Sequence, residues 1–266
     1  MKIIVCVKQV PDTSGKVAVN PDGTLNRASM ATITNPDDLN AVEAALVLKE
    51  QTGAEVVVVC MGPPPAEGML RECLARGCDR AVLVSGREFG GSDTYATSQI
   101  LAAAINKIGV DAEDIVMCGR QAIDGDTAQV GPRIAEKLGL PQISYAADIQ
   151  LDGKTVTVKR MLEDGYMTVK TQTPCLITCI KELNEPRYMS VYGIFDCYSK
   201  PYEVLDYNAL KDDPLIDPST IGLMGSPTNI LTSFTPPQKG AGMMLEGADK
   251  ATCDQLAGML AAKHMI

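Results

Sequence analysis

Short apolar runs alternate with helix-forming stretches through the first half of the chain. The predicted strands, each an almost continuous apolar run, cover residues 2–7, 55–60, 80–84 and 114–118. The predicted helices between and after them cover residues 36–51, a stretch that ends near Gly77, residues 93–108 and a stretch that includes residues 134–138. Strands that alternate with helices in this order predict an α/β fold with a doubly wound, mostly parallel sheet.

Two of these helices have clear start signals. Asn35-Pro36-Asp37-Asp38 places a capping residue, a proline and two acids at the start of the first helix, and Gly53 ends it. Ser92 is the expected cap of the helix that begins at residue 93.

The pattern changes after residue 141. Segments that cover residues 148–151, 155–160, 167–171 and 174–180 read as antiparallel strands, several of them joined by Asp-Gly turns. They are expected to extend the first sheet.

The chain beyond residue 184 is rich in prolines and turn residues. Residues 12–34, which include Pro21-Asp22-Gly23, likewise read as a loop or small hairpin. A tail with so few apolar clusters does not predict a domain of its own, so it is either a linker or a segment that lies on another protein. A closing helix at residues 250–263 carries an apolar face that needs a surface to pack on.

Composition narrows the functional classes. A formal charge of −9 argues against general nucleic-acid binding, which depends on basic patches. No apolar run reaches membrane-spanning length and the N-terminus enters a strand directly, so we expect a cytoplasmic protein that does not bind membranes. The nine cysteines are scattered and the single histidine is His264, which disfavours a metal centre and a Ser-His-Asp triad.

A polar turn at residues 118–132 joins the fourth predicted strand to the next helix. At the carboxyl end of a parallel strand such a turn is typical of a ligand site, and the helix start offers free N–H groups to an anion. Gly119 and Gly125 permit close backbone approach, while Asp126, Thr127 and Gln129 could hold phosphate and ribose. These polar residues could equally do no more than cap the helix, so the residue types alone leave both interpretations open.

Several motifs resemble the electron-transfer flavoprotein beta family. Gly-Arg-Gln-Ala-Ile-Asp-Gly-Asp-Thr-Ala-Gln-Val-Gly at residues 119–131 is similar to the family's adenine-nucleotide loop, and residues 158–178 are similar to its signature. Met167 departs from that signature, in which Glu or Gln is usual. Val-Lys-Gln-Val-Pro at residues 7–11, Asn-Pro-Asp-Asp at residues 35–38 and Asn-Glu-Pro-Arg-Tyr at residues 184–188 also match, so the resemblance spans essentially the whole chain.

The resemblance implies an adenine-nucleotide-hydrolase-like α/β fold and a heterodimer with an FAD-carrying alpha subunit. It implies three parts: a nucleotide- or flavin-binding domain at residues 1–183, a partner-recognition loop at residues 184–205, and an arm at residues 206–266 that packs on the alpha subunit. The implied cofactor-binding residues are Cys6, Asn35, Met61, Gly119, Arg120, Gln121, Ala122, Ile123, Asp124, Gly125, Asp126, Thr127, Ala128, Gln129 and Val130. Residues 126–130 would lie nearest the phosphates.

Within this family the beta site holds either structural AMP or a second FAD. Members with FAD oxidise NADH and bifurcate its electrons, one to ferredoxin or flavodoxin and one through the alpha-subunit FAD to a flavin-dependent dehydrogenase such as an acyl-CoA dehydrogenase. Arg120 with the loop after it resembles this bifurcating branch, and the chain lacks the lysine run that follows residue 188 in AMP-binding members. The resemblance also places a dehydrogenase anchor at Val191.

A regulatory adenine-nucleotide-binding module of the stress-protein type could share the first 140 residues, although it would not need a long arm. A hydrolase is the weakest alternative, because no nucleophile–base pair is visible.

Overall fold

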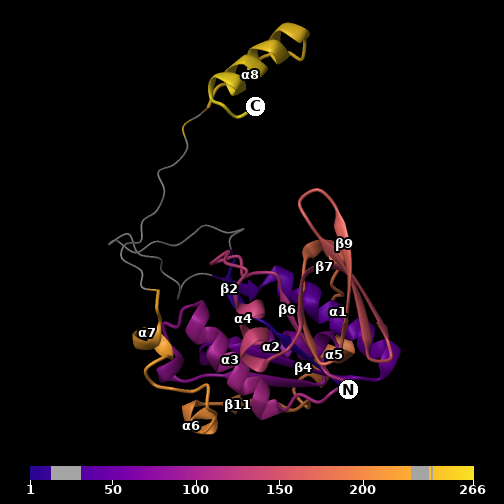
Figure 1. Cartoon of the computed structure of the whole chain (residues 1–266), viewed down its shortest axis with the longest axis vertical. Helices are drawn as coiled ribbons and strands as arrows, with labels where there is room; N and C mark the ends of the chain where they lie inside the picture. The colour runs from indigo at the N-terminus through magenta and orange to yellow at the C-terminus, as the bar shows by residue number, and fades with distance from the viewer. Residues whose placement is uncertain (13–30, 229–239, 241) are drawn as a thin grey trace.

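The computed structural model describes residues 1–12, 31–228, 240 and 242–266. Within them, nine strands form one sheet in the order β11-β5-β4-β1-β6-β10-β7-β8-β9 (Figure 1). The strands are β1 (Lys2–Cys6), β4 (Glu55–Met61), β5 (Arg80–Val84), β6 (Ile115–Gly119), β7 (Gln142–Asp152), β8 (Thr155–Met161), β9 (Tyr166–Gln172), β10 (Cys175–Cys179) and β11 (Tyr202–Leu205). The predicted doubly wound, mostly parallel α/β sheet is confirmed.

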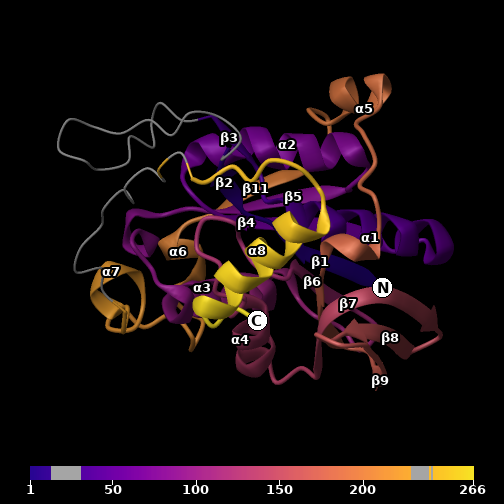
Figure 2. The ribbon, with the colours of Figure 1, turned by 90° about the horizontal axis from the view of Figure 1, so that it is seen from above.

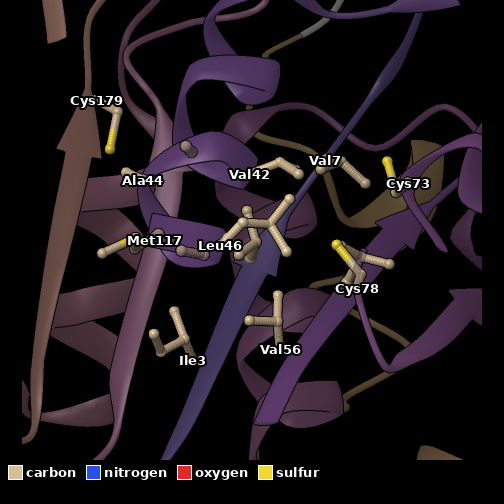
Figure 3. Close-up of a cluster of buried hydrophobic side chains, with 14 of the residues drawn as sticks. Ile3, Val7, Val42, Ala44, Leu46, Val56, Cys73, Cys78, Met117 and Cys179 are labelled. Carbon is tan, nitrogen blue, oxygen red and sulfur yellow. The ribbon is translucent and has the colours of Figure 1, made fainter. Parts of the chain in front are cut away.

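Helices cover both faces of the parallel strands (Figure 2). One face carries α1 (Pro36–Thr52) and α2 (Glu67–Arg76), and the other carries α3 (Thr94–Ile108) and α4 (Val130–Leu138). Because side chains alternate along a strand, Ile3 of β1 packs under α1 while Ile4 packs toward α3. Figure 3 shows Val42 and Leu46 of α1 over the strands. Burial on both faces explains why these strands read as continuous apolar runs.

Helix ends follow the expected signals with one correction. α1 starts at Pro36 after Asn35, and Gly53, in a left-handed conformation (φ 72°), ends it. The cap of α3 is Asp93 rather than Ser92, because the Asp93 carboxylate accepts hydrogen bonds from the first-turn amides of α3. The Ser92 hydroxyl instead donates to the Phe89 carbonyl.

The last of the four strands expected to be antiparallel is in fact parallel. β7 with β8, and β8 with β9, form antiparallel pairs as expected, but β10 inserts between β6 and β7 and runs parallel to both. All five of its residues are buried, which is the pattern of a central parallel strand.

Much of the segment after residue 183 also belongs to the body of the fold. β11 pairs in parallel with β5 at the edge of the sheet, and the short helices α6 (Tyr207–Leu210) and α7 (Gly222–Gly225) follow it. Leu205, Leu210 and Ile221 are buried in the core that α3 covers, so residues up to about 226 are not part of a free arm. These apolar side chains are scattered along the sequence, and they are buried because residues distant in the sequence pack against them.

The remaining elements are peripheral. β2 (Gln9–Pro11) and β3 (Thr32–Thr34) form the ends of the expected small hairpin, whereas the turn at Pro21–Gly23 lies outside the described residues. Short 3-10 turns are η2 (Pro64–Ala66), η3 (Arg87–Phe89) and η4 (Lys181–Leu183), and α5 (Val191–Asp196) packs near α2. α8 (Lys250–Ala262) stands apart from the sheet and buries none of its residues (Figure 1). No helix in the described part of the chain could span a bilayer.

Candidate nucleotide-binding pocket

The carboxyl ends of four strands open into one pocket of about 890 Å³. Residues that follow β1, β4, β5 and β6 line it. The helix after β1 lies on one face of the sheet and the helix after β6 lies on the other, so the neighbouring strands β1 and β6 flank the point where the winding reverses. Such a point leaves a crevice in which doubly wound sheets bind their ligands.

Asn35 holds the loop that follows β6. Its fully buried side-chain amide donates to the Gln121 carbonyl oxygen (2.8 Å) and accepts from the Ile123 amide (3.1 Å). Asn35 therefore does not line the pocket but fixes the start of the loop that does.

Within the described residues, the loop before α4 leaves several backbone amides without a hydrogen-bond acceptor. Asp126 and Ala128 both have left-handed backbones (φ 49° and 52°), a conformation that is strained for alanine. The amides of Thr127, Ala128 and Gln129 donate to no protein acceptor in the described parts of the chain. Free amides beside a helix N-terminus form a concave site for an anion.

The start of α3 faces the same pocket. Gly90, Gly91 and Thr94 line it, and the Thr94 hydroxyl donates to the Gln129 side-chain oxygen in the loop before α4 (3.0 Å). This bond connects the N-terminus of α3 to that of α4. The pocket therefore has two positive helix ends beside each other at its lining.

Asp38 and Gly119 form the pocket floor. The Asp38 carboxylate accepts hydrogen bonds from the Lys8 amide (2.8 Å) and the Gly119 amide (3.0 Å), and so ties the end of β1 to the end of β6. Burial raises the pKa of Asp38 to about 7, because these amides only partly offset its desolvation. A Cβ on Gly119 would lie 2.3 Å from the Asp38 Oδ1 atom, so only glycine fits there.

Two basic side chains at the pocket form ion pairs. Lys8 Nζ lies 2.8 Å from Asp124, and Arg120 Nε lies 3.2 Å from Asp37 Oδ2. Burial raises the pKa of Asp37, and Arg120 offsets this only partly. In the regions that the structure describes, no cluster of three metal-ligating side chains occurs.

Comparison with known proteins identifies the family. Residues 22–204 match the model of the electron transfer flavoprotein domain, and the chain is 49% identical over 267 residues to the electron transfer flavoprotein subunit beta of Clostridium acetobutylicum, covering both chains fully. The chain belongs to the electron-transfer flavoprotein beta family. Its general function is therefore electron transfer.

Two other relatives are electron-transfer subunits named for reductases. The chain is 66% identical over 267 residues to the acryloyl-CoA reductase electron transfer subunit gamma of Anaerotignum propionicum, which covers all of both chains. It is 51% identical over 265 residues to the caffeyl-CoA reductase–Etf complex subunit CarD of Acetobacterium woodii, which covers 99% of this chain and 97% of the relative.

Most of the cofactor-binding residues that the family resemblance implies line the pocket of this electron-transfer flavoprotein subunit. Those that line it are Cys6, Met61, Gly119, Arg120, Gln121, Ala122, Gly125, Asp126, Thr127, Ala128, Gln129 and Val130. Asn35, Ile123 and Asp124 do not line it: Asn35 holds the loop, the Ile123 amide donates to the Asn35 side-chain oxygen, and Asp124 pairs with Lys8. Ligand binding by these residues stays a prediction.

Sequence reasoning missed Lys8, Asp38 and the wall at residues 85–94. A signal for this wall was present, because Gly86, Gly90 and Gly91 follow a buried strand that ends at the same edge as β6.

A second exposed surface surrounds α5. Val191 (75% exposed) lies there among the exposed side chains of Tyr192 and Phe195. Arg71 of α2 supports this segment, with its guanidinium 4.7 Å from the centre of the Tyr202 ring and a hydrogen bond to the Cys197 carbonyl oxygen. The exposed apolar side chains around α5 therefore lie on a segment that Arg71 holds against α2.

Proposed function

We propose that this chain is the beta subunit of an electron-bifurcating flavoprotein and that its pocket binds FAD. The observation that carries the proposal is the extent of the pocket, which continues from the amides of residues 127–129 past the floor at Gly119 to the wall at residues 86–94. A volume of about 890 Å³ lies near the upper end of small-molecule sites, so it suits a dinucleotide better than AMP alone. The 66% identity to an acryloyl-CoA reductase electron transfer subunit supports the same choice.

The residues of the pocket fit such a ligand. The free amides of Thr127, Ala128 and Gln129, with the α4 N-terminus, would hold the diphosphate, and the bare backbone of Gly119 would permit close approach at the floor. Arg120, which is only partly covered, would add positive charge at the rim. When bound, the flavin supplies the hydride and single-electron chemistry, while the protein positions it.

The partners follow from this proposal. NADH is the proposed electron donor, and ferredoxin or flavodoxin is one acceptor. The other electron would pass through FAD of an alpha subunit to a dehydrogenase. The relatives' names refer to reductases of acryloyl-CoA and caffeyl-CoA, which makes a CoA-ester dehydrogenase the proposed class of partner.

The test is the nucleotide content of the complex co-expressed with its alpha subunit. Two FAD per heterodimer and no AMP are expected, together with NADH-dependent ferredoxin reduction that requires the second acceptor. One FAD and one AMP would refute FAD binding in this pocket and would make the chain a non-bifurcating carrier.

We further propose that the surface around α5 receives the dehydrogenase, with Val191 as its anchor. Val191→Glu places a charge in this exposed apolar patch, so we expect slower electron delivery to the dehydrogenase and unchanged flavin content. Met167→Glu, which changes another exposed apolar residue on a different element, β9, is the matched control. Equal transfer kinetics in the two variants would contradict the proposal.

A further inference from the structure

Residues 220–228 pack directly behind the pocket wall. α7, which belongs to this segment, lies beside η3 and the start of α3 (Figures 1 and 2). No residue of the segment lines the pocket, whereas residues 89–94, which it contacts, all line it. We call residues 220–228 the clasp.

Ser226 is the central contact of the clasp. Its hydroxyl accepts a hydrogen bond from the Asp93 amide (2.8 Å) and donates to the Gly222 carbonyl oxygen (2.7 Å). The Gly222 amide in turn donates to the Ser92 hydroxyl (3.1 Å). Ser226 is buried, so each lost bond would leave a polar group without water.

The Asp93 carboxylate joins the clasp to the helix that faces the pocket. Its Oδ1 atom accepts from the amides of Tyr95 and Ala96 in the first turn of α3, and its Oδ2 atom accepts from the Thr228 amide (3.0 Å). Burial opposes its ionisation, but these amides outweigh burial and lower the pKa of Asp93. One charged group therefore sets the start of α3 and holds Thr228.

Steric contacts leave almost no free space between the clasp and residues 88–91. Gly222 has a left-handed backbone (φ 65°), and a Cβ there would lie 2.3 Å from the Glu88 carbonyl oxygen. Gly91 also has a positive φ (75°), and a Cβ there would lie 2.9 Å from Leu223 Cβ. A shift of the clasp must therefore move the wall, because close-packed backbone does not deform without displacing its neighbours.

We propose that Ser226 and Asp93 are positioning residues that couple nucleotide binding in the pocket to the C-terminal part of the chain. The inference rests on the proposed nucleotide function of the pocket. A bound nucleotide would fix the wall at residues 89–94 and so tighten the clasp. Because coupling between sites is reciprocal, a change that moves Thr228 away from Asp93 would weaken nucleotide binding.

The test compares Ser226→Ala with Ser219→Ala in the complex with the alpha subunit. Ser219 belongs to the same part of the chain and is exposed, and within the described residues its amide and hydroxyl bond to Asp217 in its own turn, so it is a matched control. FAD and AMP are the probes, and their dissociation constants are measured together with amide hydrogen exchange of residues 220–228. Thr228→Pro, which removes the amide and the hydroxyl that bond to Asp93, is a second variant should Ser226→Ala fold poorly.

We expect nucleotide to slow exchange in residues 220–228 of the unaltered protein, although none of them touches the pocket. Ser226→Ala should weaken nucleotide binding by roughly tenfold, as expected for one buried hydrogen bond, and should abolish the slowed exchange, whereas Ser219→Ala should change neither. Nucleotide binding without any change in exchange, with equal affinities in the serine variants, would overturn the coupling alone. Failure of the unaltered complex to bind FAD or AMP would refute the pocket's proposed function and the coupling with it.

Discussion

Replacement of Gly119 by alanine tests the pocket floor directly. Gly119 ends β6 and its amide donates to the buried Asp38 carboxylate (3.0 Å), which also accepts from the Lys8 amide. The added Cβ would lie 2.3 Å from Asp38 Oδ1 and 2.6 Å from the carbonyl carbon of Asp37 and from the amide nitrogen of Asp38. Two of these atoms are backbone atoms in the first turn of α1, so a side-chain rotation cannot relieve the clash.

The magnitude follows from the two effects. Separation to ordinary contact requires a movement of about 1 Å in close-packed backbone, for which overpacking costs about 1–3 kcal/mol. The movement also breaks the bond between Gly119 and Asp38, which adds about 1–3 kcal/mol when a buried group loses its partner. We therefore expect Gly119→Ala to reduce the free energy of unfolding by roughly 2–6 kcal/mol and Tm by about 4–24 °C.

The assay is thermal and denaturant unfolding of the complex, with nucleotide content measured on the same samples. Gly125→Ala is the control, because Gly125 belongs to the same loop and no atom lies within 4 Å of its added Cβ. The control should unfold within about 0.5 kcal/mol of the unaltered protein. If Gly119→Ala matched the control in both Tm and nucleotide content, the close contact between β6 and α1 would not be what shapes the floor.

Three further substitutions test the surroundings of the pocket. Burial raises the pKa of Asp38, so the folded protein holds the proton of this carboxyl more tightly than the unfolded chain does. The free energy of unfolding should therefore fall as pH rises from about 4 to 7. Asp38→Asn should remove this pH dependence, which unfolding measured across that pH range would show. Burial opposes ionisation of Glu43, but Arg187 outweighs it and lowers the Glu43 pKa, so Arg187→Ala should cost about 1–3 kcal/mol at pH 7 and progressively less below pH 4 in denaturant titrations. Asn35→Ala should leave the loop carbonyl and amide unpaired and reduce nucleotide content by at least several-fold in the purified complex.

Local signals in the sequence predicted most of the fold. Continuous apolar runs identified the central strands, and Asn35-Pro36 with Gly53 gave both ends of α1. β10 was assigned the wrong direction because strand direction depends on long-range pairing, although its fully buried sequence was already that of a central parallel strand. β11 lacks a periodic apolar pattern, with only Leu205 buried, and only its pairing with β5 makes it a strand.

The sequence predicted the part of the candidate site that is continuous along the chain. The loop at residues 119–130 combines its glycines and polar residues in one stretch, and the structure places ten of these residues on the pocket. The wall at residues 85–94 follows another strand, β5. Whether this wall belongs to the pocket depends on the strand order, which puts β5 and β6 on opposite sides of β1 and β4. The clasp behind that wall, in which Ser226 meets Asp93 across more than 130 residues, leaves no local signal.

The pocket residues also show how an acidic chain would bind the anionic nucleotide that we propose. With a net charge of −9 the protein as a whole repels such a ligand at long range. The acids at the pocket each have a partner: Asp38 and Asp93 accept from backbone amides, Asp126 accepts from the Gln121 side chain, Asp37 pairs with Arg120, and Asp124 pairs with Lys8. Besides Arg87 and Arg120, the pocket offers a ligand the amides of residues 127–129 and two helix ends, which carry partial positive charge. Binding through such groups needs no basic patch, and it depends on the exact backbone path that Asn35, Gly119 and Asp93 maintain.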